Sequence, residues 1–115
     1  MTYEKLEVWQ RSFKLTVCVF KQFSSLKDYG FRDQITRSAL SIPSNIAEGW
    51  ERVTDKEKVR FLSFAKGSCG ELKTQLLIAT EIGYIDSEIV HTMSAETEQI
   101  AKMLGALMNK LARSS

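Results

Sequence analysis

Hydrophobic positions recur at spacings of three and four along almost the whole chain, which is the period of an amphipathic α-helix. Between residues 5 and 25 there are two such stripes. The first contains Leu6, Trp9, Phe13, Val17 and Phe20. The second contains Val8, Leu15, Val19 and Leu26, rotated by roughly a third of a turn. We interpret the first stripe as facing the core, and we expect Val8, Leu15 and Val19 to contact a neighbouring subunit. The alternative is that this helix lies at the centre of a bundle and buries both stripes.

A second helix is predicted over residues 31–50, and it contains the chain's only proline. Its apolar face consists of Phe31, Ile35, Ala39, Ile42, Ile46 and Trp50. A polar row runs beside that face and consists of Gln34, Ser38, Ser41, Asn45 and Glu48. Because Pro43 has no N–H, it removes the hydrogen bond to the Ala39 carbonyl, and an interior proline costs ~3 kcal/mol. We therefore expect a bend at Pro43, with neighbouring serines capping the freed carbonyl.

A third helix is predicted from Thr54 to about Ile82. Thr54-Asp55-Lys56-Glu57 has the form of a capping box, in which Thr54 is the N-cap and Glu57 reaches back. A buried stripe runs along this helix through Phe61, Ala65, Leu72, Leu76 and Ala79. Beside it lies a second hydrogen-bonding row of Ser68, Glu71 and Gln75. Gly67 and Gly70 lie inside the helix, and we interpret them as places where another backbone approaches closely.

A fourth helix starts at Asp86 and Ser87 and continues to about Leu111, with an apolar face at helical spacing. No segment alternates like a β-strand. Helices joined by short connections lie antiparallel to their neighbours. The pattern predicts an all-α fold in one domain over residues 1–115: an antiparallel, up-down-up-down four-helix bundle with a proline-kinked second helix.

Composition agrees with a globular protein and adds a small asymmetry of charge. The 115 residues are 43% hydrophobic and 26% charged, with a net charge of +2. Residues 1–73 hold thirteen Lys and Arg against nine Asp and Glu, whereas the remainder holds three against five. From the basic part we select Arg11, Lys14, Lys21 and Arg37 as a candidate nucleic-acid patch. No apolar run is long enough for a signal peptide or a membrane span, so we expect a cytoplasmic protein with no membrane partner.

Catalytic and cofactor motifs are missing from the sequence. His91 is the only histidine and lies opposite the apolar face of its helix, so a metal pair or a catalytic base is not expected. Cys18 and Cys69 are far apart in the chain and are interpreted as reduced, buried thiols. Glu48 and Glu71 could form a carboxylate pair if the two polar rows face each other. The favoured alternative is a hydrogen-bond network of Ser41, Asn45, Glu48, Ser68, Glu71 and Gln75. In this network we expect Asn45 and Glu71 to be more buried than their residue types usually are and to have side-chain partners across the two helices. The sequence predicts no enzyme and no cofactor.

Several short motifs, in order and spacing, resemble a known family. They are Leu6-Glu7-Val8-Trp9, Tyr29-Gly30-Phe31-Arg32-Asp33-Gln34-Ile35, Ser41-Ile42-Pro43-Ser44-Asn45-Ile46-Ala47-Glu48-Gly49, Phe61-Leu62 and Glu71-Leu72-Lys73-Thr74-Gln75-Leu76. The chain is similar here to the four-helix-bundle proteins encoded in intervening sequences of bacterial 23S rRNA genes, which are often called ribosomal proteins. The resemblance covers residues 3 to about 85. The chain departs from it at Thr36, where a second arginine is common.

The resemblance implies a ring-like homopentamer of antiparallel four-helix subunits. It also implies a relationship to the accessory bundle protein of diversity-generating retroelements, a basic pentamer that binds nucleic acid and a reverse transcriptase. Two functions follow as hypotheses. The first is an oligomeric scaffold that binds RNA or DNA weakly and without sequence preference. The second is a protein-interaction module whose polar rows on the second and third helices receive a protein partner.

Overall fold

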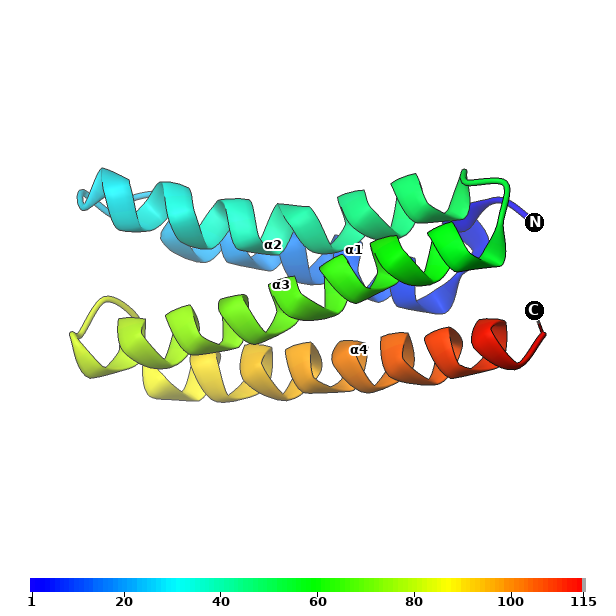
Figure 1. Ribbon diagram of the computed structural model, residues 1–115. Coiled ribbons are helices and arrows are strands. Elements are labelled where there is room, and N and C mark those ends of the chain that lie inside the picture. Colours follow the sequence, from blue (N-terminus) through cyan, green and yellow to red (C-terminus); the bar gives the residue numbers. More distant parts are fainter. Residues whose placement is uncertain (115) are drawn as a thin grey trace.

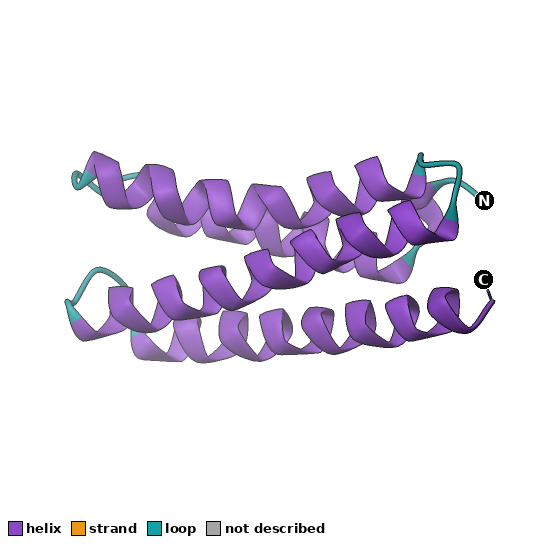
Figure 2. Ribbon diagram, viewed as in Figure 1, coloured by secondary structure: helices purple, strands orange, loops and turns teal. Residues whose placement is uncertain are grey.

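Four long helices make up the protein in the computed structural model, which describes residues 1–114 (Figure 1). A short 3₁₀ turn, η1 (Tyr3–Lys5), precedes α1 (Glu7–Phe23). The other helices are α2 (Tyr29–Trp50), α3 (Asp55–Glu81) and α4 (Ser87–Ser114). Figure 2 shows only helices and connecting loops over the described residues. The predicted all-α class is confirmed.

The helices run up and down along a rod with extents of 46 × 20 × 20 Å. The two chain ends lie at one end of the rod together with the α2–α3 connection, and the other two connections lie at the opposite end (Figure 1). Helix α1 packs against α2 and α4, and α3 packs against the same two helices. Helices α1 and α3 are therefore diagonal to each other. This is the antiparallel four-helix bundle that the helix lengths and short loops predict.

Local capping explains where the helices begin and end. The Asp28 carboxylate accepts a hydrogen bond from the Phe31 N–H at 3.1 Å, which fixes the start of α2. Thr54 caps α3 as predicted, since its hydroxyl accepts from the Glu57 N–H at 3.2 Å. The Glu57 side chain does not complete the capping box and instead lies 3.7 Å from Arg60. Gly83, with φ of 80°, follows the end of α3 in the left-handed conformation that glycine adopts without strain.

All four helices contribute to one hydrophobic core. The α2 face predicted to be buried is confirmed at its four central positions, and Phe31 and Trp50 pack at the edges of the core. The face expected from α3 is also inside, although Phe61 is only half-buried. None of the helices among residues 1–114 is long and apolar enough to cross a membrane.

The prediction for the two stripes of α1 is wrong. Val8 and Leu15 are each 4% exposed and Val19 is 0% exposed within one subunit, so they cannot contact a second copy. Side chains of the other stripe are the accessible ones, since Phe13 is 50% exposed and Phe20 is 44% exposed. Small polar residues decide this orientation. They lie on the same face as the buried stripe, and their hydroxyls bond to backbone carbonyl oxygens.

The two polar side chains buried on this face of α1 are Ser12 and Thr16. Ser12 Oγ donates to the Trp9 carbonyl at 2.9 Å. Thr16 Oγ1 lies 2.7 Å from the Ser12 carbonyl oxygen and 3.0 Å from the carbonyl oxygen of Ala39 on α2. Buried hydroxyls that find acceptors in this way no longer oppose burial of the face that carries them. A count of apolar residues alone therefore selects the wrong side of α1.

Helix α2 continues through Pro43 without interruption from Tyr29 to Trp50. The Ala39 carbonyl that Pro43 leaves without its N–H partner is met by Thr16 of α1, and not by the neighbouring serines that the sequence suggested. The bend at Pro43 stays a prediction. Two serines of α2, Ser38 and Ser41, bond instead to side chains of α3.

Close backbone approach occurs at a glycine other than the two predicted. A Cβ atom at Gly49 would lie 2.6 Å from Cβ of Phe61, so α2 and α3 meet there at a distance that only glycine permits. A Cβ atom at Gly67 or Gly70 would meet no atom within 4 Å. Both of these glycines are exposed on the outer face of α3. Within one subunit, the predicted role of Gly67 and Gly70 is therefore wrong.

Candidate functional site

The polar rows of α2 and α3 do meet along the seam between these helices. The hydroxyl of Ser41 donates to Ser68 Oγ at 2.6 Å, and Ser68 Oγ lies 3.2 Å from the Phe64 carbonyl oxygen. One turn away, the Ser38 hydroxyl donates to the Glu71 carboxylate. Two of the bonds expected of a network between the helices are therefore present, although Ser38 was not among the six residues selected.

The other members of the predicted network do not link the helices. Asn45 Nδ2 donates to the Ser41 carbonyl oxygen of its own helix at 2.8 Å. Glu48 is exposed and pairs with Arg52 at 3.0 Å, one turn further along the chain. Asn45 is half-buried but has no partner on α3, so the expected bond across the helices is wrong for it. Glu71 has such a partner in Ser38, but it is exposed, so the expected burial is wrong for it. Gln75 Oε1 is buried and makes no hydrogen bond within residues 1–114.

No carboxylate pair forms, because the two candidates have different partners. Glu48 pairs with Arg52, which follows the end of α2, and Glu71 accepts from a serine hydroxyl. The seam consequently holds no pair of acids that could share a proton. Its hydrogen bonds fix the register of α2 against α3.

The predicted basic patch divides into residues with different surroundings. Arg11 holds α1 to α4, because its Nε and Nη2 donate to the two carboxylate oxygens of Glu96 at 2.9 and 2.5 Å. Its Nη1 also lies 3.8 Å from Glu7. The hydrogen bond from Arg11 lowers the pKa of Glu96. The guanidinium is thus already neutralised by carboxylates, which leaves it a poor ligand for phosphate.

Lys14, Lys21 and Arg37 are exposed, and none of them forms an ion pair with another residue of the described chain. Lys14 and Lys21 are seven residues apart and so share one face of α1, two turns of helix from each other. Arg37 lies across the α1–α2 seam, where it lines a hollow with Phe20 and Leu40. The structure therefore leaves a pair of free lysines on α1 and one separate arginine on α2.

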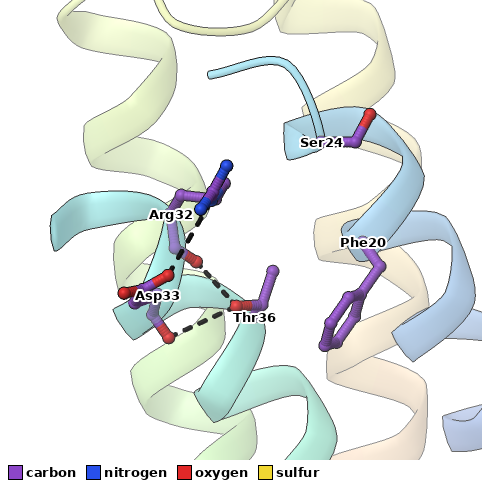
Figure 3. A pocket seen from close by; sticks show the side chains of 5 residues that line it. All are labelled: Phe20, Ser24, Arg32, Asp33 and Thr36. Carbon is purple, nitrogen blue, oxygen red and sulfur yellow. Dashed lines mark hydrogen bonds and ion pairs between the residues drawn. The ribbon is translucent and has the colours of Figure 1, made fainter. Parts of the chain in front are cut away.

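A groove that the sequence analysis did not identify runs along the seam between α1 and α2. Its three hollows have volumes of about 310, 250 and 220 Å³ and share lining residues from one to the next. Figure 3 shows Phe20 of α1 facing Arg32, Asp33 and Thr36 of α2 across the first hollow, with Ser24 above. We call this feature the α1–α2 groove. Its apolar lining comes from Trp9, Phe13, Phe20, Leu40, Pro43 and Ala47.

An aromatic row borders one end of the α1–α2 groove. The ring centroids of Tyr3 and Trp9 are 5.3 Å apart, and those of Trp9 and Phe13 are also 5.3 Å apart. The exposed apolar residues of α1 thus lie in an ordered line rather than scattered. The helical spacing of these residues is visible in the sequence, where it predicts a stripe that faces the core. The structure shows that much of this stripe is accessible instead.

A second accessible apolar surface lies on the outside of α3. It consists of Phe64, Leu77, Ile78 and Ile82, which are between 45% and 52% exposed, together with Gly67 and Gly70. We call it the α3 stripe. In the sequence, this surface is indicated by Gly67 and Gly70, which have no side chain to cover the helix backbone on this side.

The remaining reactive groups do not form a site. His91 is exposed, as predicted. No cluster of metal-binding side chains occurs within residues 1–114. Both cysteines are free, as expected, but Cys18 is exposed and only Cys69 is buried, so the prediction of two buried thiols is half wrong. Burial raises the pKa of the Cys69 thiol to about 12, which makes it unreactive at neutral pH.

Comparisons with known proteins agree with this architecture. The family model described as "23S rRNA-intervening sequence protein" matches residues 4–106. A crystal structure of a protein of unknown function from the S23 ribosomal protein family of Bacteroides thetaiotaomicron VPI-5482 is similar, with a TM-score of 0.83 and 23% sequence identity. The similarity covers 88% of this chain and 97% of that one. At this identity the structural likeness supports the fold alone. No curated protein matches the chain.

Proposed function

The chain belongs to the family of 23S rRNA-intervening sequence proteins, and on that premise we propose that it is a non-enzymatic, homo-oligomeric scaffold of the cytoplasm that binds nucleic acid weakly. The pentamer implied by the family resemblance is the assembly we favour. The observation that carries the proposal is the presence of two ordered apolar surfaces, the α1–α2 groove and the α3 stripe, on a subunit whose core is complete without them.

Assembly would remove these surfaces from water. Burial of apolar area contributes roughly 25 cal/mol per Å², and large exposed apolar patches of soluble proteins commonly mark interaction sites. Four residues of the α3 stripe and at least two of the groove are about half exposed in the single subunit. A subunit that carries both surfaces can gain more from association with copies of itself than one with scattered apolar residues.

Nucleic-acid binding is supported by Lys14 and Lys21, which lie free on one face of α1. Two lysines per subunit give only weak attraction to phosphates, so a single copy would not bind usefully. An oligomer repeats the pair in every subunit, and simultaneous contacts raise the effective affinity well above that of one pair. Binding through phosphates is independent of base sequence and weakens steeply as salt rises.

The test combines assembly with the salt dependence of binding. We expect sedimentation equilibrium at micromolar concentration to give a mass several times 13.1 kDa. We expect a labelled single-stranded RNA to bind at low salt, and Lys14→Glu with Lys21→Glu to abolish binding without changing the mass. The matched control is Lys102→Glu with Lys110→Glu on α4, which makes the same change of charge on another face. A stable monomer, or RNA binding that the first pair of substitutions leaves intact, would refute the proposal.

The second hypothesis, a module that binds a protein through its polar rows, is less supported. Ser38, Ser41, Ser68 and Glu71 already bond to one another across the α2–α3 seam. A partner at the seam would have to replace these bonds. Wild-type protein that oligomerises but fails to bind nucleic acid at low salt would favour this hypothesis.

A further inference from the structure

We infer that the α1–α2 groove of one subunit receives the α3 stripe of a second copy, so that the contact between subunits is heterologous. The inference rests on the proposed function for the existence of a homo-oligomer, and it adds which two surfaces pair. Three features of the subunit lead to it: the shapes of the two surfaces, their lengths and charges, and their positions in the bundle.

The shapes of the surfaces are complementary to each other and not to themselves. The groove is a line of hollows between two helices, whereas the stripe is the outer side of a single helix. A helix surface fits into the groove between two helices, as ridges fit into grooves in bundles. Two grooves facing each other would leave the hollows empty. The open space at Gly67 and Gly70 lets the α3 backbone come close to whatever covers it.

The lengths of the two surfaces match. The stripe runs from Phe64 to Ile82, which at 1.5 Å per residue is roughly 27 Å. The α2 side of the groove runs from Arg32 to Ala47, which is roughly 23 Å by the same rise. One α3 helix can therefore occupy the groove along nearly all of its length.

The charges at the two surfaces also agree. Arg37 lines the groove and has no ion pair within residues 1–114, whereas the other two charged residues of its lining, Arg32 and Asp33, lie 3.8 Å from each other. Two carboxylates lie at helical spacing among the residues of the stripe: Glu81, which is exposed and likewise has no ion pair among the described residues, and Glu71, whose partner is a neutral serine. A cation at the end of the stripe, Arg60 over the Phe64 ring, already lies 3.7 Å from Glu57. An arginine on one surface and carboxylates on the other favour the pairing of groove with stripe over the pairing of either surface with itself.

The positions of the surfaces make the contact repeat. Because α1 and α3 are diagonal in the bundle, the groove and the stripe lie on different sides of the subunit. Each copy then offers one groove and one stripe, so the contact repeats from copy to copy, and the assembly is a closed ring when the rotation between copies closes. In such an assembly Arg37 is covered by the neighbouring subunit. Lys14 and Lys21 are each one residue, or about 100° of helix rotation, beyond Phe13 and Phe20, and they stay available for nucleic acid.

The experiment uses two variants that each damage one surface. Phe20→Asp places a charge in the groove, and Ile78→Asp places a charge on the stripe. Both side chains are nearly half exposed in the subunit, so both variants should keep the wild-type circular dichroism spectrum. We expect each variant alone to sediment as a monomer. An equimolar mixture at several hundred micromolar should contain a one-to-one dimer, since one intact groove and one intact stripe remain. The control Val53→Asp, at an apolar residue that is 98% exposed between α2 and α3, should assemble like the wild type.

Disulfide capture provides an independent measurement in the full oligomer. In a Cys18→Ser background, the double variant Phe20→Cys with Ile78→Cys should give a ladder of covalently linked chains after oxidation, and each single cysteine variant should give none. Covalent dimers from either single variant would mean that like surfaces pair, and would overturn the inference. The inference would also be overturned if the wild type forms an oligomer and either Phe20→Asp or Ile78→Asp keeps the mass of that oligomer. That result would leave the proposed oligomer intact. A monomeric wild type would refute both.

Discussion

The hydroxyl of Thr16 on α1 lies 3.0 Å from the carbonyl oxygen of Ala39 on α2, the acceptor that Pro43 leaves without its helical N–H. Thr16 is buried, and so is Ala39. A buried carbonyl without a partner is costly, and here a second helix supplies the partner. Pro43 thus links α2 to α1, because it leaves a carbonyl oxygen of α2 without its helical N–H donor and a hydroxyl of α1 bonds to that oxygen.

Removal of this hydroxyl should destabilise the fold. We expect Thr16→Val to lower the free energy of unfolding by about 1–2 kcal/mol, because the Ala39 carbonyl then stays buried and unpaired. The measurement is urea denaturation followed by circular dichroism. Thr16→Ser keeps the hydroxyl and serves as the control, with a smaller loss.

A double-mutant cycle separates the hydrogen bond from the loss of packing. In a Pro43→Ala background, the N–H of the new alanine can donate to the Ala39 carbonyl, so Thr16→Val should cost about 1 kcal/mol less than in the wild type. Equal costs in the two backgrounds would show that Thr16 does not act through the proline.

The ion pair between Arg11 and Glu96 should make stability depend on pH. The hydrogen bond from Arg11 lowers the pKa of Glu96 in the folded state from an ordinary value of 4.5. The unfolded state therefore takes up a proton first as the pH falls, and the stabilisation present above pH 4.5 is lost as the pH drops through the lowered pKa. We expect Glu96→Gln to be less stable than the wild type at pH 7, and we expect this difference to shrink progressively as the pH falls below 4.5. Glu4→Gln, at an exposed glutamate of η1, should not alter the pH profile.

Gly49 should tolerate no larger side chain. An added Cβ atom would lie 2.6 Å from Cβ of Phe61, and α2 and α3 would have to separate. We expect Gly49→Ala to destabilise the protein by about 1–3 kcal/mol, despite the better helix propensity of alanine. Gly30→Ala is the matched control in the same helix, where the nearest atom would be 3.8 Å away. Thermal melts of the two variants that coincide would contradict the close contact.

The two cysteines should differ in reactivity. Cys18 is exposed, whereas burial raises the pKa of Cys69 to about 12. At pH 8 a thiol reagent should label one cysteine per chain rapidly, and Cys18→Ser should remove that label. Denaturation should expose the second thiol. Rapid labelling of folded Cys18→Ser protein would show that the environment of Cys69 opens on the timescale of the reaction.

Much of the fold could be predicted because it depends on local rules. The helix periods, the Thr54 cap and the short loops each act within a few residues, and together they fix four antiparallel helices. The buried face of α2 was also predictable, since its apolar residues form one unbroken line. Helix α1 has two apolar lines, and there the choice depends on Ser12 and Thr16, whose burial is possible only when backbone acceptors are in reach.

The candidate surfaces were less predictable. The sequence identified the residues that carry the contact of Ser41 with Ser68, but it placed Glu48 and Arg11 in roles that their actual partners exclude. Side chains as long as glutamate and arginine can reach partners on either side of a helix. Which partner they take depends on neighbours that come from distant parts of the chain.

The sequence by itself determined the helical class, the order and approximate ends of the helices and, through its motifs, the family, because spacing and capping are local properties. Only the tertiary structure decided which stripe of α1 is buried, which group meets the carbonyl freed by Pro43, and which apolar side chains stay exposed as the α1–α2 groove and the α3 stripe. These depend on how each helix is rotated about its axis. That rotation is set by packing and hydrogen bonding across all four helices together.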